Sequence, residues 1–409
     1  MAKMNFDDQV ALLMQGTEYG DDSLQKAMAD ELRARLIEAD KSGRPLKVYC
    51  GFDPRTSDLH LGHTVPMRKM RQFQELGHEV IFVIGRYTSL IGDPSDKDEL
   101  RPQLTLEETT YNAETYARQA FKILDPDRTR VEYNDTWLSE LSFADVIKMA
   151  SNFTIQQFLT RETFRRRFDE GDPIYVHEFF YALMQAYDAF HLGTDVQIGG
   201  SEQLFNIITA GRKLMEAMGA KPNIGILMGI LPGTDGDIRM SKSLGNHIAL
   251  LASPEDMFGK VMSLPDRAMP AYFRMVTRWT PSDIAEREVA LRTGDLHPRD
   301  AKLQLAHEIV SVYHGEQAAV EAEAAFRKVF QDQGTPDDMP DYAIQPGQTL
   351  VDVMVDSGLV SSKSQARRLV KQNGVKLDDV GVEDGDQPIA LEAATILRIG
   401  KRRFLRLVP

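Results

Sequence analysis

Two histidines, His60 and His63, close the segment YCGFDPRTSDLHLGH. Residues three apart lie on one face of a helix, so both imidazoles can donate hydrogen bonds to one anion. Gly62 between them has no side chain and lets a phosphate or a flat ring approach the backbone. Such donors can stabilise charge on a phosphate leaving group. The alternatives are a surface or helix-capping pair and a metal site, but no third metal ligand stands nearby.

A cationic segment, GTDGDIRMSKSLGN, follows about 180 residues later. Arg239 and Lys242 supply positive charge, and Ser241 and Ser243 supply hydroxyl groups. A glycine-rich cationic loop suits a pyrophosphate that must be clamped in a transition state and then released. Taken alone, the segment is more typical of an ordinary surface loop.

A mostly apolar helical stretch, HEFFYALMQAYDAF, contains Tyr181, Gln185 and Asp188. Spacings of four and three place these polar groups on one helical face. A buried carboxylate and amide cost free energy unless each finds a partner. The partner is either neighbouring backbone or a substrate hydroxyl, and the stretch alone leaves both open.

Alternating apolar runs and helical segments must position these residues. The runs LKVYCGF, EVIFVIG, TRVEYN, DVQIGG and NIGILMGIL are typical of buried strands. Their alternation with helices predicts the α/β class, with an open, mostly parallel sheet covered on both faces. Ligands of such sheets bind at the carboxyl ends of the strands, where helix N-termini attract anions. The first histidine motif follows one such end.

Composition divides the chain further. Residues 251–330 look all-helical, whereas 331–346 are proline-rich and acidic, as in a linker. We therefore expect a catalytic domain at 1–250, a helical domain at 251–330, a linker at 331–346 and a small α+β domain at 347–409. The net charge of the chain is −13, but residues 347–409 carry +2. Basic residues cluster in this last domain, which favours RNA docking over a merely solvated surface. They include Lys363, Arg367, Arg368 and Lys371, and also Arg398, Lys401, Arg402, Arg403 and Arg406.

The cellular setting follows from features that are missing from the sequence. No apolar stretch approaches the roughly 18 residues of a membrane helix, and the first ten residues do not resemble a signal peptide. The single cysteine, Cys50, excludes internal disulfides and is typical of a reducing compartment. We expect a cytoplasmic protein with no membrane partner.

The paired motifs resemble the HIGH and KMSKS motifs of class I aminoacyl-tRNA synthetases, and YxxxQxxD resembles the tyrosine pocket of bacterial-type tyrosyl-tRNA synthetases. The resemblance covers essentially the whole chain. It implies a Rossmann-like sheet and assigns His60, His63, Arg239 and Lys242 to catalysis. It implies tyrosine-binding roles for Tyr49, Asp93, Asn134, Tyr181, Gln185, Asp188 and Gln203. It implies ATP-binding roles for Cys50, Gly51, Asp53, Gly62, Gly200, Glu202, Ser241 and Lys242.

The resemblance further implies a two-step tyrosine–tRNA ligase. Its substrates would be L-tyrosine, ATP with Mg²⁺ and tRNA(Tyr), with no permanently bound cofactor and no resident metal. The tail resembles an S4-type RNA-binding domain, in which Lys363, Arg367, Arg368 and Lys371 would meet tRNA phosphates. Members of this family are homodimers. Two departures stand out: Glu202 replaces a shorter acid, and Arg55 occupies the position of a phosphate-contacting threonine.

Three alternatives remain. A tryptophanyl enzyme shares both motifs but lacks the aspartate on the pocket helix and usually the tail. An enzyme adenylating a tyrosine derivative would not need the basic tail. An RNA-binding factor on a decayed synthetase scaffold would not need an intact HLGH and RMSKS.

Overall fold

A computed structural model of the chain describes residues 4–54, 58–94, 106–330, 339–378, 380–389, 391, 393–400 and 403–409. Arg55, Lys401 and Arg402 lie outside the described residues. The chain forms two compact units, Met1–Ala319 and Val320–Pro409, and each is considered by itself.

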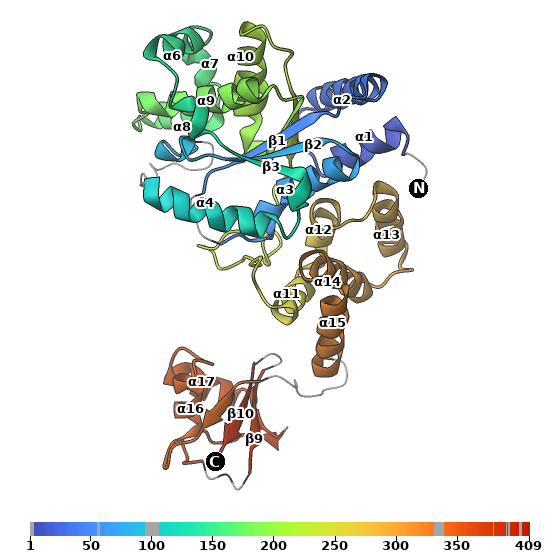
Figure 1. Cartoon of the computed structure of the whole chain (residues 1–409). Helices are drawn as coiled ribbons and strands as arrows, with labels where there is room; N and C mark the ends of the chain where they lie inside the picture. Colours follow the sequence, from blue (N-terminus) through green and yellow to red (C-terminus); the bar gives the residue numbers. More distant parts are fainter. Residues whose placement is uncertain are drawn as a thin grey trace. The chain divides into compact units, whose positions relative to one another are not determined.

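A five-stranded parallel sheet forms the centre of the first unit (Figure 1). Its order is β3-β2-β1-β4-β5, and all four pairings are parallel. The strands are β1 (Lys47–Phe52), β2 (Glu79–Ile84), β3 (Thr129–Tyr133), β4 (Val196–Gly200) and β5 (Ile224–Met228). The order reverses between β1 and β4, and ligands of doubly wound sheets bind at such a switch point. The predicted fold class is confirmed.

Helices cover both faces of this sheet. In Figure 1, α9 (Val176–Leu192) and α10 (Arg212–Ala217) lie on one side, and α3 (Leu61–Glu75) and α4 (Leu106–Ala120) lie on the other. On the α9 side, Tyr49, Ile81 and Val83 of the strands pack with Met184 and Leu192. The period of two along each strand therefore sends Tyr49 towards α9 and Cys50 to the opposite face.

The remaining helices of this unit frame the sheet. They are α1 (Phe6–Met14), α2 (Asp22–Ser42), α5 (Asp135–Leu138), α6 (Phe143–Ala150), α7 (Ile155–Phe158) and α8 (Glu162–Glu170). After β4 the chain forms a 3-10 turn at Ser201–Gln203 and then a π-helix at Phe205–Gly211 before α10. A π-helix inserts extra backbone into a turn and is frequent at functional sites. Here it begins two residues after Gln203.

The segment after the sheet is helical, as predicted. Its helices are α11 (Pro254–Met262), α12 (Met269–Val276), α13 (Pro281–Thr293), α14 (Pro298–His314) and α15 (Glu316–Phe330). Prolines at the starts of α11, α13 and α14 lack an N–H that would otherwise be unsatisfied, and Ser253, Thr280 and His297 cap these helices. No helix among the described residues has both the length and the apolar character needed to cross a membrane.

A mixed sheet of order β6-β10-β9-β7-β8 organises the second unit. Its elements are β6 (Asp341–Ala343), α16 (Leu350–Asp356), α17 (Lys363–Lys371), β7 (Val375–Leu377), β8 (Val380–Gly381), β9 (Thr395–Ile399) and β10 (Arg403–Val408). Strand β6 pairs in parallel with β10 and lies inside the stretch expected to be a linker. An edge strand tolerates the preceding Pro340 because the missing N–H is not needed by a neighbouring strand.

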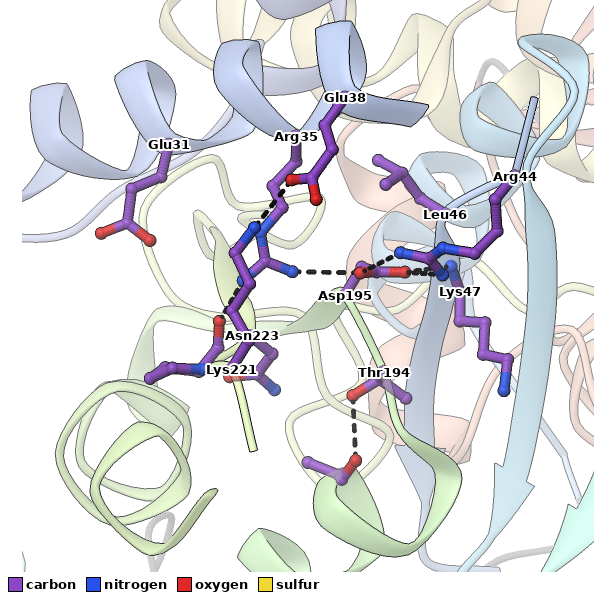
Figure 2. Close-up of polar contacts among 12 residues, drawn as sticks. Glu31, Arg35, Glu38, Arg44, Leu46, Lys47, Thr194, Asp195, Lys221 and Asn223 are labelled. Atoms are coloured by element: carbon purple, nitrogen blue, oxygen red, sulfur yellow. Dashed lines mark hydrogen bonds and ion pairs between the residues drawn. The ribbon is translucent and has the colours of Figure 1, made fainter. Parts of the chain in front are cut away.

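A buried polar cluster joins α2 to the amino-terminal ends of β1 and β4. Figure 2 shows Arg35 and Arg44 reaching Asp195 from either side. Arg35 donates to Asp195 Oδ1 over 3.0 Å, Arg44 donates to both oxygens over 2.9 Å, and the Lys47 N–H donates to Oδ2 over 2.9 Å. This cluster lies at the amino-terminal ends of the strands. The predicted site lies at their carboxyl ends, on the opposite side of the sheet.

Candidate active site

The HLGH motif begins helix α3. His60 is the N-cap residue, and its Nδ1 accepts the Gly62 N–H over 3.2 Å. His63 Nδ1 accepts the His60 N–H over 3.2 Å, so the two imidazoles satisfy two free helix donors reciprocally. Their ring centroids are 3.9 Å apart. The capping role left open by the sequence is therefore real, and it also fixes both rings at a helix N-terminus.

The electrostatic setting keeps His60 neutral. Burial, together with the charges of His63, His247, Lys242 and Arg239, lowers the pKa of His60 to about 3. Gly62 is required here, because a Cβ at this position would lie 3.0 Å from the His60 ring. The neutral His60 imidazole beside two cationic side chains forms a site for a polyanion.

The RMSKS segment reaches the histidines through a short antiparallel bridge. Leu61 donates its N–H to Ile248 O over 3.0 Å, and Leu250 donates to Leu59 O over 2.9 Å. Lys242 Nζ lies 3.1 Å from Asp58 Oδ2, so this cation stands just ahead of the histidine motif. Ser241 Oγ and Ser243 Oγ are 2.8 Å apart. The two motifs, distant in sequence, thus lie side by side.

Asp188 of α9 is a buried carboxylate held by neutral donors. Trp137 Nε1 donates to Asp188 Oδ1 over 2.7 Å, and Asn134 Nδ2 donates to Oδ2 over 3.2 Å. Burial raises the pKa of Asp188 to about 7, although both hydrogen bonds oppose this shift. Tyr49 is buried nearby in the same core, and its hydroxyl donates to Gln185 O over 3.2 Å. Each Asp188 oxygen keeps a further lone pair for another donor.

Tyr181 contacts Asp53, the residue that follows β1. The resemblance had grouped Tyr181 with Asp93 instead. Its hydroxyl donates to Asp53 Oδ2 over 3.0 Å, and Thr88 donates to Asp53 Oδ1 over 2.7 Å. Gly85 makes room for this contact, because a Cβ there would lie 2.3 Å from Asp53 Oδ1. The structure thus joins a residue expected to bind tyrosine to one expected to bind ATP.

The Asp93 carboxylate accepts hydrogen bonds from Arg161 and Gln203. Arg161 donates to Asp93 Oδ1 over 3.1 Å, and Gln203 Nε2 donates to Oδ2 over 2.5 Å. Gln185 Oε1 is buried and has no hydrogen-bond partner in the part of the chain that the structure describes. An unpaired buried acceptor costs roughly 1–3 kcal/mol, so a donor from a bound ligand would relieve this cost.

The remaining expected ATP residues stand at the carboxyl ends of β1 and β4. Burial raises the pKa of the Cys50 thiol, which therefore stays protonated. Gly51 is exposed, with open space where a Cβ would stand. At Gly200 a Cβ would lie 2.2 Å from the Glu202 carboxylate, so the longer acid folds back over the strand end.

Sequence reasoning missed several residues of this site. Thr88, Trp137 and Arg161 hold Asp53, Asp188 and Asp93 respectively. Trp137 could have been found, because it lies three residues after Asn134 in YNDTW. Thr88 and Arg161 carry no local signal, since only the fold brings them to their partners.

The four cationic residues expected to contact RNA lie on α17, where Arg367, Arg368 and Lys371 are exposed. Two of the four are engaged by acids of the same unit. Lys363 Nζ lies 2.7 Å from Asp352 Oδ1, and Arg367 forms a forked contact with Asp386 at 2.7–3.0 Å. The basic face of this helix is therefore partly neutralised.

Comparison with protein families gives two matches that together cover most of the chain. The family described as "tRNA synthetases class I (W and Y)" matches residues 41–331. The family described as "Tyrosine--tRNA ligase SYY-like C-terminal domain" matches residues 331–407. The two matches meet at the predicted start of the linker.

Curated relatives and solved structures agree with these matches. A tyrosine–tRNA ligase of Moorella thermoacetica is 49% identical over 379 residues, which cover 92% of each chain. One of Thermotoga maritima is 46% identical over 91% of this chain and 92% of its own. A tyrosyl-tRNA synthetase of Archaeoglobus fulgidus complexed with L-tyrosine has a TM-score of 0.59 at 23% identity, covering 78% of this chain and all of its own. At that identity the likeness shows the fold alone.

Proposed function

Because the chain belongs to the class I tRNA synthetases of the tryptophan and tyrosine family and is a tyrosine–tRNA ligase, we propose how its residues perform the two steps. In the first step, a carboxylate oxygen of tyrosine attacks the α-phosphorus of ATP. The bond from that phosphorus to the β-phosphate breaks, and pyrophosphate leaves with the electron pair. A carboxylate is already a nucleophile, so positioning and charge stabilisation carry the rate.

We assign recognition of the phenol to Asp188 and Tyr49. Asp188 presents an ionisable carboxylate whose geometry Trp137 and Asn134 fix, and the phenol O–H donates to it. The single observation that carries this assignment is a buried aspartate with only neutral donors, because an apolar ring would leave it without its last hydrogen bond. A tryptophan side chain cannot place a hydroxyl there, which disfavours the tryptophanyl alternative.

We assign the α-ammonium group to the acceptors around Asp93, Gln185 and Tyr181. Gln203 holds Asp93 in place, and Gln185 Oε1 offers a buried acceptor. Three N–H donors of an ammonium match several oxygens that converge from different elements.

We assign the triphosphate to the two paired motifs. His60 and His63 donate from the start of α3, and Arg239 and Lys242 neutralise charge on the departing pyrophosphate. The rest of the ATP molecule would contact the other residues expected to bind it, which are Cys50, Gly51, Asp53, Gly62, Gly200, Glu202 and Ser241. We propose that Mg²⁺ enters with ATP as part of the substrate.

In the second step, a hydroxyl of the terminal ribose of tRNA(Tyr) attacks the tyrosyl carbonyl, and AMP leaves. We propose that the C-terminal domain from about residue 347 binds this tRNA through Lys363, Arg367, Arg368 and Lys371 of α17. Phosphate contacts of this kind depend on salt. We propose that protein synthesis places the enzyme in the cytoplasm. We also propose that the helical stretch 251–330 is a domain of its own, which follows the catalytic domain 1–250 in the chain.

We further propose a homodimer that uses the exposed apolar side chains of α6 to α9. Phe143 and Ile147 lie one turn apart on α6 and are 78% and 55% exposed, and Val176 at the start of α9 is 70% exposed. Large exposed apolar side chains gathered in one region mark an association surface. Sedimentation of Val176→Glu should give a monomer where the unchanged protein gives a dimer.

ATP–pyrophosphate exchange across the twenty amino acids tests the first step. Tyrosine alone should support exchange. Replacing His60 with Asn or Lys242 with Ala should slow exchange by roughly 10²–10³-fold while the dissociation constant for tyrosine stays unchanged. Equal losses in exchange and in tyrosine binding would contradict the assignment of these residues. Aminoacylation of bulk tRNA tests the second step.

A further inference from the structure

A side-chain amide lies at the centre of the loop that carries Arg239 and Lys242. The loop, residues 231–246, starts as a short hairpin, in which Met240 donates to Leu231 O over 3.1 Å and Gly233 donates to Ile238 O over 2.8 Å. Asn246 closes the loop and turns its side chain back into the hairpin, where it is only 7% exposed. A Cβ on Gly233 would lie 2.3 Å from that side chain, so the loop is built closely around it.

The Asn246 amide uses both its donor and its acceptor ends. Its Oδ1 accepts the Ser241 N–H over 2.8 Å. Its Nδ2 donates to Arg239 O over 3.2 Å and to Asp235 Oδ2 over 2.5 Å. Arg239 and Ser241 flank Met240 inside the RMSKS motif. The backbone on both sides of Met240 is therefore hydrogen-bonded to one side chain.

Asp235 completes this arrangement from the hairpin turn. Its Oδ1 accepts the N–H groups of Asp237 and Ile238 over 2.9 and 2.8 Å. The next residues after Asn246 lead to Ile248, whose carbonyl accepts the Leu61 N–H at the start of α3. The amide thus stands where the cationic loop joins the segment bonded to the histidine motif.

We propose that Asn246, with Asp235, is the positioning residue that sets the conformation in which Arg239 and Lys242 meet the pyrophosphate. Asn246 does not need to touch the substrate. Without its amide, the Arg239 carbonyl and the Ser241 N–H lose their partner, and the loop spreads over other conformations. A misplacement of about 1 Å can cost on the order of a hundredfold in rate. This proposal rests on the proposed function, because it assigns the loop to adenylate formation.

The test measures pyrophosphate exchange and tyrosine binding in parallel for Asn246→Ala. Exchange should fall roughly ten- to a hundredfold through kcat and the KM for ATP, and the dissociation constant for tyrosine should not change. Asn152→Ala is the matched control, because that amide also donates to two backbone carbonyls, those of Lys148 and Met149, on a different helix end. The control should keep the exchange rate of the unchanged protein.

Adding a carboxylate at position 246 separates positioning from a general loss of structure. Asn246→Asp places a second carboxylate against Asp235, and two such groups share a proton as the pH falls. The exchange rate of this variant relative to the unchanged protein should rise from pH 8 to pH 6. The double variant Asp235→Asn with Asn246→Asp restores one amide–carboxylate contact and the acceptor for the Ser241 N–H, but not the donor to Arg239 O. It should therefore recover part of the exchange that Asn246→Asp loses, and it should lose that pH dependence.

Three results would overturn the proposal: full activity of Asn246→Ala, a pH-independent ratio for Asn246→Asp, or no recovery in the double variant. If thermal unfolding shows that Asn246→Ala is not folded, Asn246→Asp and the double variant still test the proposal. Absence of exchange in the unchanged protein would instead contradict the proposed function, so the two failures are distinguishable.

Discussion

Two buried aspartates, Asp188 and Asp195, lie near opposite ends of the strands of the same sheet. They differ in the charge of their hydrogen-bond donors. Asp188 is 4% exposed and, among the described residues, accepts hydrogen bonds from the neutral side chains of Trp137 and Asn134. Asp195 is 5% exposed and receives two guanidinium groups and a backbone N–H (Figure 2). Burial raises the pKa of Asp188 to about 7. Burial would also raise the pKa of Asp195, but Arg44, Lys47 and Arg35 outweigh it and hold that pKa below its ordinary value.

This difference separates a binding group from a structural one. Two guanidinium groups of the protein already compensate the charge of Asp195, so a ligand would add little stabilisation to it. The charge of Asp188 is not compensated, so a donor from a ligand adds stabilisation that the empty site lacks. Burial alone therefore does not identify a functional carboxylate, whereas the charge of its partners does.

Removing Asp195 should give the largest loss of stability. Asp195→Ala leaves Arg35 buried without its carboxylate, and breaking a buried pair costs roughly 3–5 kcal/mol. Urea unfolding measures this loss. The matched control is Asp7→Ala, which breaks the exposed pair with Arg33 and should cost far less stability, because solvent screens both charges. Equal losses in the two variants would remove the distinction between buried and exposed partners.

The pH dependence of stability should have opposite signs for the two groups. Because the folded pKa of Asp188 is raised from 3.8 to about 7, the folded protein holds a proton that the unfolded chain has lost. Stability from this group is therefore present at low pH and falls by about 1.4 kcal/mol per unit as the pH rises through that window. For Asp195, stability is present above its unfolded pKa and is lost as the pH falls through its lowered folded pKa.

Unfolding free energies of the unchanged protein and of Asp188→Asn, measured from pH 4 to pH 8, isolate the first slope. The difference between the two proteins should change steadily between about pH 4 and pH 7 and level off above it. A difference that does not vary with pH would show that Asp188 is ionised throughout, as Asp195 is.

Asp188→Asn should also change which amino acid is activated. A hydrogen bond to a charged group contributes about 1.5–3 kcal/mol, so kcat/KM for tyrosine should fall roughly ten- to a hundredfold. Activation of phenylalanine serves as the internal control and should not fall, because its ring carries no hydroxyl for this carboxylate. A parallel fall for both amino acids would mean that Asp188 only supports the pocket.

The smallest effect is expected where a carboxylate pairs on the surface. Asp386→Asn frees Arg367 for a tRNA phosphate. Because the pair is exposed and solvent screens it, tRNA binding should tighten by no more than about fivefold. Filter binding at fixed salt measures this. Asp356→Asn is the control, since Asp356 accepts from Gln348 and not from a basic residue of α17. Weaker binding after Asp386→Asn would show that the pair instead holds Arg367 in its binding position.

Local sequence determined the elements and the candidate residues of this protein. Short strand-like runs alternating with helical segments predicted the parallel strands, and the spacing in HLGH, RMSKS and YxxxQxxD indicated the main polar groups of the site. These features are readable because strand burial and helical faces repeat with periods of two and 3.6 residues. The strand inside the expected linker was missed, since three residues carry too little period to be recognised.

Only the tertiary structure decided what each polar group does. No local pattern distinguishes Asp188 from Asp195, because their partners come from α2, β1 and the loop after β3. The same holds for Tyr181, which meets Asp53 from 128 residues away, and for Asn246, whose amide closes on a hairpin turn eleven residues earlier. Charge balance and desolvation depend on neighbours in space, and the fold alone sets those neighbours.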